Sequence, residues 1–214
     1  MYVAVALLGC AAILILIRCN GDGTSGSTAA TSTVGSNCPG PSLLVDCGFE
    51  SPVVPVGGFQ LFSVDGDVSG WKVIGAAGNV APLSTAYANG RFSWPAHEGN
   101  QTLDLTGLSN TATGVSQIVS TKSATTYKLS FWVGNIANPG GPWGISSSVT
   151  VLVDGSQILE AVNSDGAGEN SLSWKLFTMQ FTATSSTTTI AFVNGDPSTD
   201  ETNIIDQVEL IALH

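Results

Sequence analysis

The clearest evidence for the fold class is the run Thr126-Tyr127-Lys128-Leu129-Ser130-Phe131-Trp132-Val133. Its large apolar side chains occupy every second position, at Tyr127, Leu129, Phe131 and Val133. Successive side chains of a strand point to opposite faces of a sheet, so this period of two predicts a strand with one buried face. Trp132 is out of phase with these residues, and we expect it on the opposite face of the same strand.

Short alternating runs of the same kind continue on both sides of this stretch, from Ser42 to the C-terminus. The clearest lie at 43–49, 149–153, 177–181 and 204–210, and an Asp154-Gly155 turn follows the second. We recognise no helical stretch in this region. About nine to eleven short strands predict an all-β fold, a two-sheet antiparallel jelly-roll β-sandwich. The side chains expected between its sheets are Phe49, Phe131, Val151 and Phe181.

The N-terminal residues 1–19 form an apolar segment that we interpret as a signal or a membrane anchor. Tyr2–Ile17 is apolar throughout apart from Gly9 and Cys10, yet it is shorter than the roughly 20 residues of a typical membrane span. Leu7-Leu8-Gly9-Cys10 resembles a bacterial lipobox, in which Cys10 would be lipid-modified. Plain secretion and a buried core element remain alternatives. We therefore expect an extracellular or cell-surface protein that contacts membrane only through this segment.

Residues 20–41 are predicted to form a flexible linker, and 42–214 the jelly-roll domain. Of the 17 residues Asn20–Ser36, 14 are Gly, Ser, Thr or Ala. Such a segment cannot bury enough apolar surface to order itself.

The charge balance limits the partners of this chain. With 16 acidic and 6 basic residues its net charge is −10, which would repel a phosphate backbone, so nucleic acid is not expected as a partner. Neutral glycans or divalent cations fit the balance better, although solubility alone also explains it.

Four cysteines stand at positions 10, 19, 38 and 47. Their spacing does not match that of a zinc site. Cys38 and Cys47 could join as a local disulfide in an oxidising compartment, or remain as two thiols.

Several motifs together resemble a known family. Leu44–Pro52 (LVDCGFESP) resembles the opening of the choice-of-anchor C family, which is related to a plant cell-wall domain of unknown function. The strongest stretch is Trp94–Leu105, and Thr126–Phe131 and Ile205–Val208 follow in order. The same skeleton is similar to galactose-binding-like jelly-roll carbohydrate-binding modules.

This resemblance implies a β-sandwich without catalytic activity, often with a structural calcium ion. Two residues depart from the pattern: Cys47 stands in place of a small polar residue, and Gln207 in place of Asn. The second departure weakens the transfer of site details at the C-terminal end.

Residues for catalysis are scarce. The histidines are His97 and His214, and we find no nucleophile elbow, zinc-protease motif or phosphate-binding loop. We therefore expect no enzymatic activity, although a pair of carboxylates on facing strands remains an alternative.

Three carboxylates suggest a structural calcium site. Asp206 is in phase with Ile204, Val208 and Leu210, which are expected to face the core, and a carboxylate there needs a partner. Asp46 and Glu50 share one face of the expected first strand, which lies near the last strand in a jelly roll. Asp46, Glu50 and Asp206 could therefore bind calcium, or accept hydrogen bonds without metal.

Aromatic and planar polar side chains suggest a carbohydrate site, because sugars combine flat apolar faces with hydroxyl groups. The candidate glycan-binding residues are Tyr87, Arg91, Trp94, His97, Glu98, Asn100, Trp132 and Trp143. For each Trp the alternative is that it fills the core under its own loop. We expect an exported, monomeric carbohydrate-binding module for a polysaccharide or cell-wall glycan. The alternative function is an envelope or cell-wall interaction domain.

Overall fold

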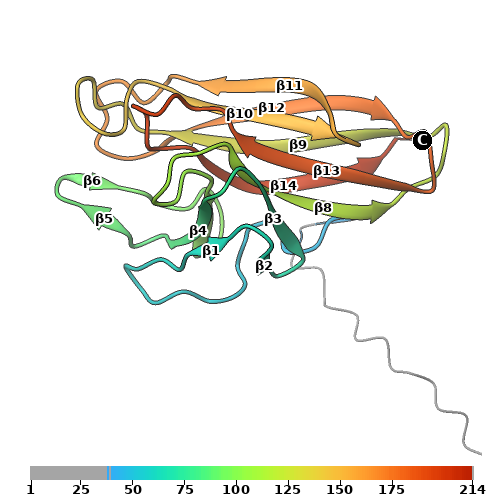
Figure 1. Ribbon diagram of the computed structural model, residues 1–214, viewed down its shortest axis with the longest axis horizontal. Helices are drawn as coiled ribbons and strands as arrows, with labels where there is room; N and C mark the ends of the chain where they lie inside the picture. The colour runs from blue at the N-terminus through green and yellow to red at the C-terminus, as the bar shows by residue number, and fades with distance from the viewer. Residues whose placement is uncertain (1–37, 39, 214) are drawn as a thin grey trace, which may run out of the picture. The chain divides into compact units, whose positions relative to one another are not determined.

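The structure is a computed structural model that describes residues 38 and 40–213 (Figure 1). Within these residues all regular secondary structure is β-strand, arranged in two six-stranded antiparallel sheets and one small hairpin. The prediction of an all-β, two-sheet jelly-roll sandwich is therefore confirmed. The Asp154-Gly155 turn lies between β10 and β11, and both of its residues have positive φ.

The first sheet has the strand order β1-β4-β7-β14-β9-β12. Its strands are β1 Phe62–Ser63, β4 Asn79–Ser84, β7 Gln101–Asp104, β14 Ile204–Ala212, β9 Thr126–Asn135 and β12 Ser173–Thr182. The second sheet has the order β11-β10-β13-β8-β3-β2. Its strands are β11 Ser156–Asn163, β10 Ser147–Val153, β13 Thr187–Asn194, β8 Thr113–Ser120, β3 Trp71–Gly75 and β2 Asp67–Val68. The hairpin consists of β5 Ala88–Asn89 and β6 Phe92–Ser93.

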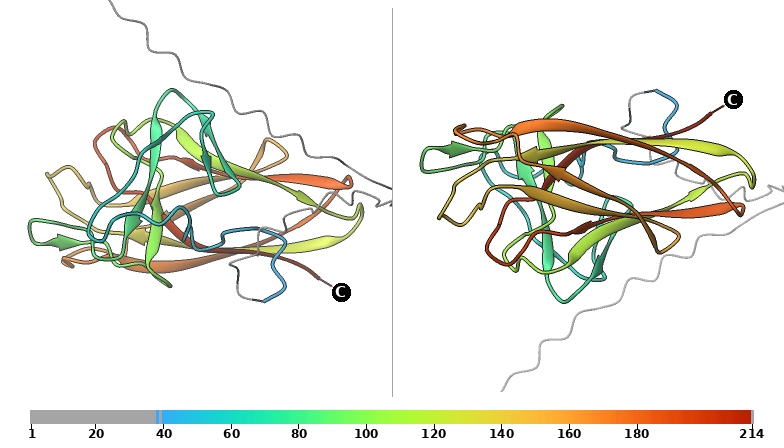
Figure 2. Two further views of the ribbon diagram at one scale, coloured as in Figure 1. Left: turned by 90° about the horizontal axis from the view of Figure 1, so that it is seen from below. Right: turned by 90° about the horizontal axis from the view of Figure 1, so that it is seen from above.

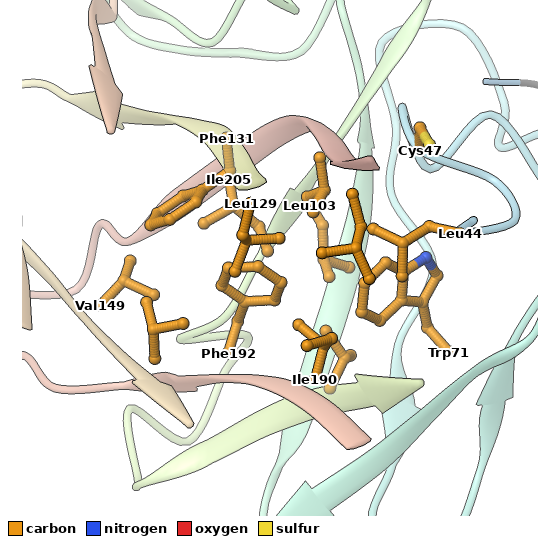
Figure 3. Close-up of a cluster of buried hydrophobic side chains, with 14 of the residues drawn as sticks. Leu44, Cys47, Trp71, Leu103, Leu129, Phe131, Val149, Ile190, Phe192 and Ile205 are labelled. Atoms are coloured by element: carbon orange, nitrogen blue, oxygen red, sulfur yellow. The ribbon is translucent and has the colours of Figure 1, made fainter. Parts of the chain in front are cut away.

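The main core fills the space between the two sheets, which Figure 2 shows as two layers. Trp71, Phe131 and Phe192 are fully buried there, with ring centroids 5.9 Å apart for Trp71 and Phe192 (Figure 3). Phe49 and Val151 are also fully buried, as predicted. Phe181 is only half-buried, because it belongs to the edge strand β12.

Residues 43–49 were expected to form the first strand, but the structure shows turns there. Asp46 and Phe49 have φ values of 49° and 55°, which a continuous strand does not permit. The segment is still tied to β14, since the Leu43 N–H donates to the Leu210 carbonyl and the Val208 N–H donates to the Cys47 carbonyl.

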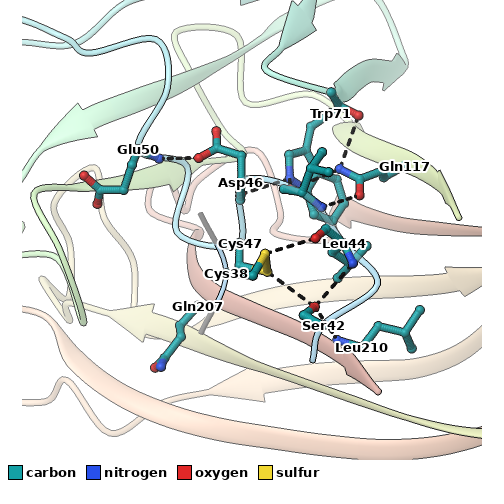
Figure 4. The surroundings of a disulfide bond; sticks show 12 residues. Cys38, Ser42, Leu44, Asp46, Cys47, Glu50, Trp71, Gln117, Gln207 and Leu210 are labelled. Carbon is teal, nitrogen blue, oxygen red and sulfur yellow. Dashed lines mark hydrogen bonds between the residues drawn. A yellow bond between two sulfur atoms is a disulfide. The ribbon is translucent and has the colours of Figure 1, made fainter. Parts of the chain in front are cut away.

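A disulfide between Cys38 and Cys47 closes this segment on itself (Figure 4). Gln117 binds the middle of this segment, because its side chain accepts a hydrogen bond from the Val45 N–H and donates one to the Val45 carbonyl. The indole N–H of Trp71 donates to the carbonyls of Val45 and Asp46. The pairing of the two cysteines, which the sequence left open, is thus present.

A β-bulge in β14 reverses the expected phase of Asp206. The pairing of β14 with β9 shifts register between Asp206 and Glu209, and Gln207 has a φ of 46°. Val208 therefore faces the core between the sheets, whereas Ile204 belongs to a second cluster on the outer face. Asp206 has the phase of Ile204, so it is buried on the outer face and not between the sheets.

The predicted anchor at 1–19 and nearly all of the predicted linker at 20–41 lie outside the described residues. Within residues 38 and 40–213, no helix is long and apolar enough to cross a membrane.

Candidate functional site

A second apolar cluster covers part of the outer face of the first sheet, on the side away from the second sheet. The sheet supplies Ala81 and Leu83 from β4 and Ile204 from β14. Segments around the β5–β6 hairpin and the loop between β9 and β10 add aromatic side chains. Three of the predicted glycan-binding residues meet here: Tyr87, Trp94 and Trp143.

The aromatic rings of this cluster touch one another in an unbroken series. Phe59 meets Tyr87 edge-on with centroids 5.7 Å apart, and Tyr87 lies 5.3 Å from Trp94. Trp94 lies 5.1 Å from Trp143, which contacts Phe92 at 4.5 Å. Trp94 is only 4% exposed and so fills the core under its loop, as the alternative interpretation held.

A cavity of about 180 Å³ opens beside these rings. Its aromatic walls are Phe59, Tyr87, Trp94 and Trp143. Its acidic side chains are Asp104 and Glu201. The cavity is smaller than the roughly 300–1,000 Å³ of typical drug-sized sites, so it suits a small molecule.

Asp104 is the last residue of β7, and its neighbours Leu103 and Leu105 are fully buried between the sheets. Because Asp104 lies between these two leucines, its side chain points to the opposite, outer face of the sheet, where it lines the cavity. The hydroxyl of Thr106 donates to Oδ1 of Asp104 at 2.6 Å, and the Thr106 N–H donates to the same oxygen at 2.8 Å. Burial raises the pKa of Asp104 to about 7 against the lowering effect of these bonds.

The other predicted aromatic, Trp132, lies at a separate place on the same outer face. His97 stacks on its ring, with centroids 3.9 Å apart and planes 20° from parallel. Trp174 meets His97 edge-on at 5.7 Å. Burial lowers the pKa of His97 below its usual range. A groove beside Trp132 is lined by Lys128, Ser130, Trp132, Leu176, Thr178, Gln207 and Glu209.

The remaining glycan candidates are not gathered at either place. Arg91 is exposed on the β5–β6 hairpin, with its guanidinium 4.8 Å from the centroid of the Phe92 ring. Glu98 and Asn100 are exposed in the loop before β7, and neither lines the cavity or the groove.

The three predicted calcium ligands lie near the bulge. Oδ1 and Oδ2 of Asp46 accept the N–H groups of Glu50 and Ser51, and Oδ2 of Asp206 accepts that of His97 at 2.9 Å. Burial raises the pKa of Asp46 to about 6 and that of Asp206 to about 7, and the charge of Glu50 adds to both effects.

Glu50 is thus near both aspartates, but no three acidic, histidine or cysteine side chains of the described chain converge as a metal-binding group. The backbone N–H groups that donate to Asp46 and Asp206 agree with the alternative in which these carboxylates accept hydrogen bonds without metal. Calcium binding by Asp46, Glu50 and Asp206 stays a prediction.

Sequence reasoning missed Asp104, Phe59 and Glu201. A signal for Asp104 exists in the run Thr102-Leu103-Asp104-Leu105, where a carboxylate is out of phase with two leucines. The same rule placed Trp132 on the outer face. Nothing local indicated that the cavity would form there, because its rings come from three distant segments.

Comparisons with known proteins identify relatives of this fold. Residues 41–210 match the family model HpiC1-like, described as HpiC1 cyclase. No curated protein is significantly similar to the chain in sequence. A cyclase from Fischerella sp. TAU, in complex with 4-(1H-indol-3-yl)butan-2-one, has a TM-score of 0.55 and 19% identity, over 81% of this chain and 98% of that chain.

Two further solved structures are similar to this chain. A Stig cyclase from the same organism, in complex with an indole compound, has a TM-score of 0.54 and 18% identity, over 81% of this chain and 98% of that one. The CBM22-1 xylan-binding domain from Paenibacillus barcinonensis has a TM-score of only 0.45 and 16% identity, over 74% and 97%. A similarity as distant as the last one shows nothing about a ligand.

The family match corrects one expectation. The chain was expected to lack enzymatic activity, and this is wrong, because the family model that it matches describes a cyclase. The sequence contains no nucleophile elbow, zinc-protease motif or phosphate-binding loop, whereas the carboxyl groups of this cavity lie among aromatic rings from distant segments. The comparisons do not show the resemblance to the choice-of-anchor C family.

Proposed function

The chain belongs to the HpiC1-like cyclase family, and we propose that its aromatic cavity is the active site of a ring-forming enzyme. One observation carries this proposal: the carboxyl group of Asp104 lies in the wall of a cavity whose aromatic side chains are Phe59, Tyr87, Trp94 and Trp143.

Each part of this site suits ring closure in a small aromatic substrate. Aromatic walls pack against flat rings and attract positive charge through their π faces. A carboxyl group beside the bound molecule can transfer a proton or stabilise a positive charge that develops as the ring closes. The indole ligands of the Fischerella cyclases suggest a substrate of similar size.

Calorimetric titration of the full chain with 4-(1H-indol-3-yl)butan-2-one tests the binding step. We expect saturable binding with a Kd between about 1 µM and 1 mM, weakened at least tenfold by Trp143→Leu. Trp132→Leu is the matched control, because it removes an indole outside the cavity. Equal loss in both variants, or no binding by the wild type, would contradict the proposal.

The catalytic step needs a substrate whose ring closure leaves the mass unchanged, such as an indole with an alkenyl side chain. Asp104→Asn keeps the shape and an acceptor for Thr106, and we expect it to slow product formation by about 10²–10⁴-fold while ligand binding persists. A new chromatographic peak of equal mass reports the product. Unchanged turnover in Asp104→Asn would exclude the role assigned to this carboxyl group.

We propose glycan binding at the Trp132 groove as a second function, in an exported protein at the cell surface. The supporting observation is that a half-buried indole borders a groove with hydroxyl, amide, amino and carboxyl groups, a combination suited to sugars. Affinity electrophoresis with soluble cell-wall polysaccharides tests it. Trp132→Ala should lose retardation and Trp143→Ala should keep it, whereas migration of the wild type unaffected by any polysaccharide would refute it.

A further inference from the structure

The carboxyl group of Asp104 is bound on one side by Thr106, which lies two residues beyond the end of β7 and is fully buried. The Thr106 hydroxyl donates to Oδ1 of Asp104 at 2.6 Å, and the Thr106 N–H donates to the same oxygen at 2.8 Å. An oxygen that already accepts two hydrogen bonds is the less basic oxygen of a carboxyl group. These two bonds therefore favour a proton on the other oxygen, Oδ2.

The Thr106 hydroxyl has a second acceptor within reach. The backbone carbonyl of Glu201, on the connection between β13 and β14, lies 3.1 Å from it. A hydroxyl carries one hydrogen, which it can direct to either acceptor by rotation. It can donate to the carboxylate when Asp104 is ionised and to the Glu201 carbonyl when Asp104 is protonated. The buried hydroxyl therefore has a partner in both protonation states.

Ionised Asp104 has no cationic neighbour in the described part of the cavity wall, since none of the lining residues is Lys, Arg or His. Burial raises the pKa of Asp104 to about 7, and the Thr106 hydroxyl lowers it more than any backbone N–H group does. The other titratable groups around Asp104 are Glu201 and Tyr87 in the cavity wall and Asp196, whose pKa is raised by burial and further by the charge of Asp104. Stabilisation of the carboxylate thus falls to hydrogen bonds, and that of Thr106 is the strongest.

We infer that Thr106 is the positioning residue of the acid: it holds Asp104 with Oδ2 available for the proton, and it stabilises the carboxylate that remains after the proton has left. This inference rests on the proposed ring closure. In that reaction the π electrons of a substrate double bond take the proton from Asp104, and the ring-closed cation later loses a proton to the carboxylate. The acid is thereby restored, and substrate and product have equal mass.

Nuclear magnetic resonance titration of the Asp104 carboxyl group tests the inference without a substrate, and Asp104→Asn assigns its signal. Thr106→Val removes the hydroxyl but keeps the size of the side chain and the backbone N–H. Because the ionised form loses a donor, the pKa of Asp104 should rise by about 1–2 pH units. Thr106→Ser restores a hydroxyl and should return the titration to its wild-type position.

The pH profile of turnover, with an indole that carries an alkenyl side chain, gives a second measurement. Wild-type turnover should fall as the pH rises through the pKa of Asp104, because the protonated acid supplies the proton. Thr106→Val should move this decrease to higher pH by the same interval and lower the maximal turnover about tenfold. Binding of 4-(1H-indol-3-yl)butan-2-one should persist, because Thr106 is buried behind Asp104 and does not line the cavity.

Thr102→Val is the matched control. Thr102 lies on β7 and is also fully buried, and its hydroxyl donates to the Ile205 carbonyl at 2.9 Å. The variant therefore loses a comparable buried hydrogen bond but leaves those of Asp104 in place. It should keep the wild-type titration and pH profile even where its Tm falls.

An Asp104 titration that is the same in the wild type and in Thr106→Val would overturn the inference, whatever happens to turnover. Equal shifts in Thr106→Val and Thr102→Val would also overturn it, because they would show a general effect of losing a buried hydroxyl. A shift confined to Thr106→Val in a chain that forms no product would support the role of Thr106 and contradict only the proposed ring closure. If Thr106→Val does not fold, Thr106→Ala provides the same comparison with a smaller side chain.

Discussion

Opening the Cys38–Cys47 disulfide should destabilise the start of the domain measurably. Cys38→Ser is the suitable change, because Cys38 is half-buried whereas Cys47 is 1% exposed within the main core. The variant leaves the buried Cys47 sulfur in place as a small apolar group. Leu44, between the two cysteines, also packs in that core and would lose its tether.

The magnitude follows from the length of the closed loop. For a sequence separation of 9, the chain-entropy model assigns the cross-link about 2.6 kcal/mol of stability at 25 °C. For a domain of this size, each kcal/mol lowers the Tm by about 2–4 °C, so a decrease of roughly 5–10 °C is expected.

Urea denaturation of the full chain, followed by tryptophan fluorescence, measures this loss. Trp71, one of five tryptophans, donates hydrogen bonds to Val45 and Asp46, so part of the fluorescence comes from this segment. The wild type in reductant is the matched control and should behave like Cys38→Ser. A loss below about 0.5 kcal/mol, or a wild type that does not respond to reductant, would refute the reasoning.

Three further changes probe other parts of the structure. Phe131→Ala, at a fully buried position, should cost about 3–5 kcal/mol in urea denaturation by leaving a cavity between the sheets. Gln101→Leu leaves the Val54 N–H without its acceptor, which should cost at least about 1–3 kcal/mol and speed hydrogen exchange at Val54. If Asp206 belongs to a calcium site, calcium at 100 times its Kd should add about 2.7 kcal/mol of stability, and Asp206→Asn should lose this gain; an identical Tm in chelator and in calcium would speak against such a site.

The sandwich was predictable because alternation is a local property. In β9 the inward side chains Tyr127, Leu129, Phe131 and Val133 are all buried, and Trp132 faces outward as its phase requires. Strand β10 repeats the pattern, with Val149 and Val151 fully buried. Burial of one face is enough to specify the period of a strand wherever the backbone stays regular.

Local irregularities of the backbone made the prediction from alternation wrong at two other places. Residues 43–49 alternate in sequence, but positive φ at Asp46 and Phe49 turns the chain. In β14 one bulge at Gln207 moved Asp206 from the expected inner face to the outer one. None of these three residue types requires a positive φ, so alternation alone could not indicate where the phase would change.

The candidate sites were harder to predict because both lie on the outer face of the first sheet. Alternation shows that Asp104 and Trp132 point away from the core, but it does not show what covers them. Over Asp104, segments distant in sequence add Tyr87, Trp94 and Trp143 and create a cavity. Beside Trp132, His97 stacks on the indole ring, and a groove stays open. Whether the outer face forms a cavity or an open groove therefore depends on loops that no period in the strands encodes.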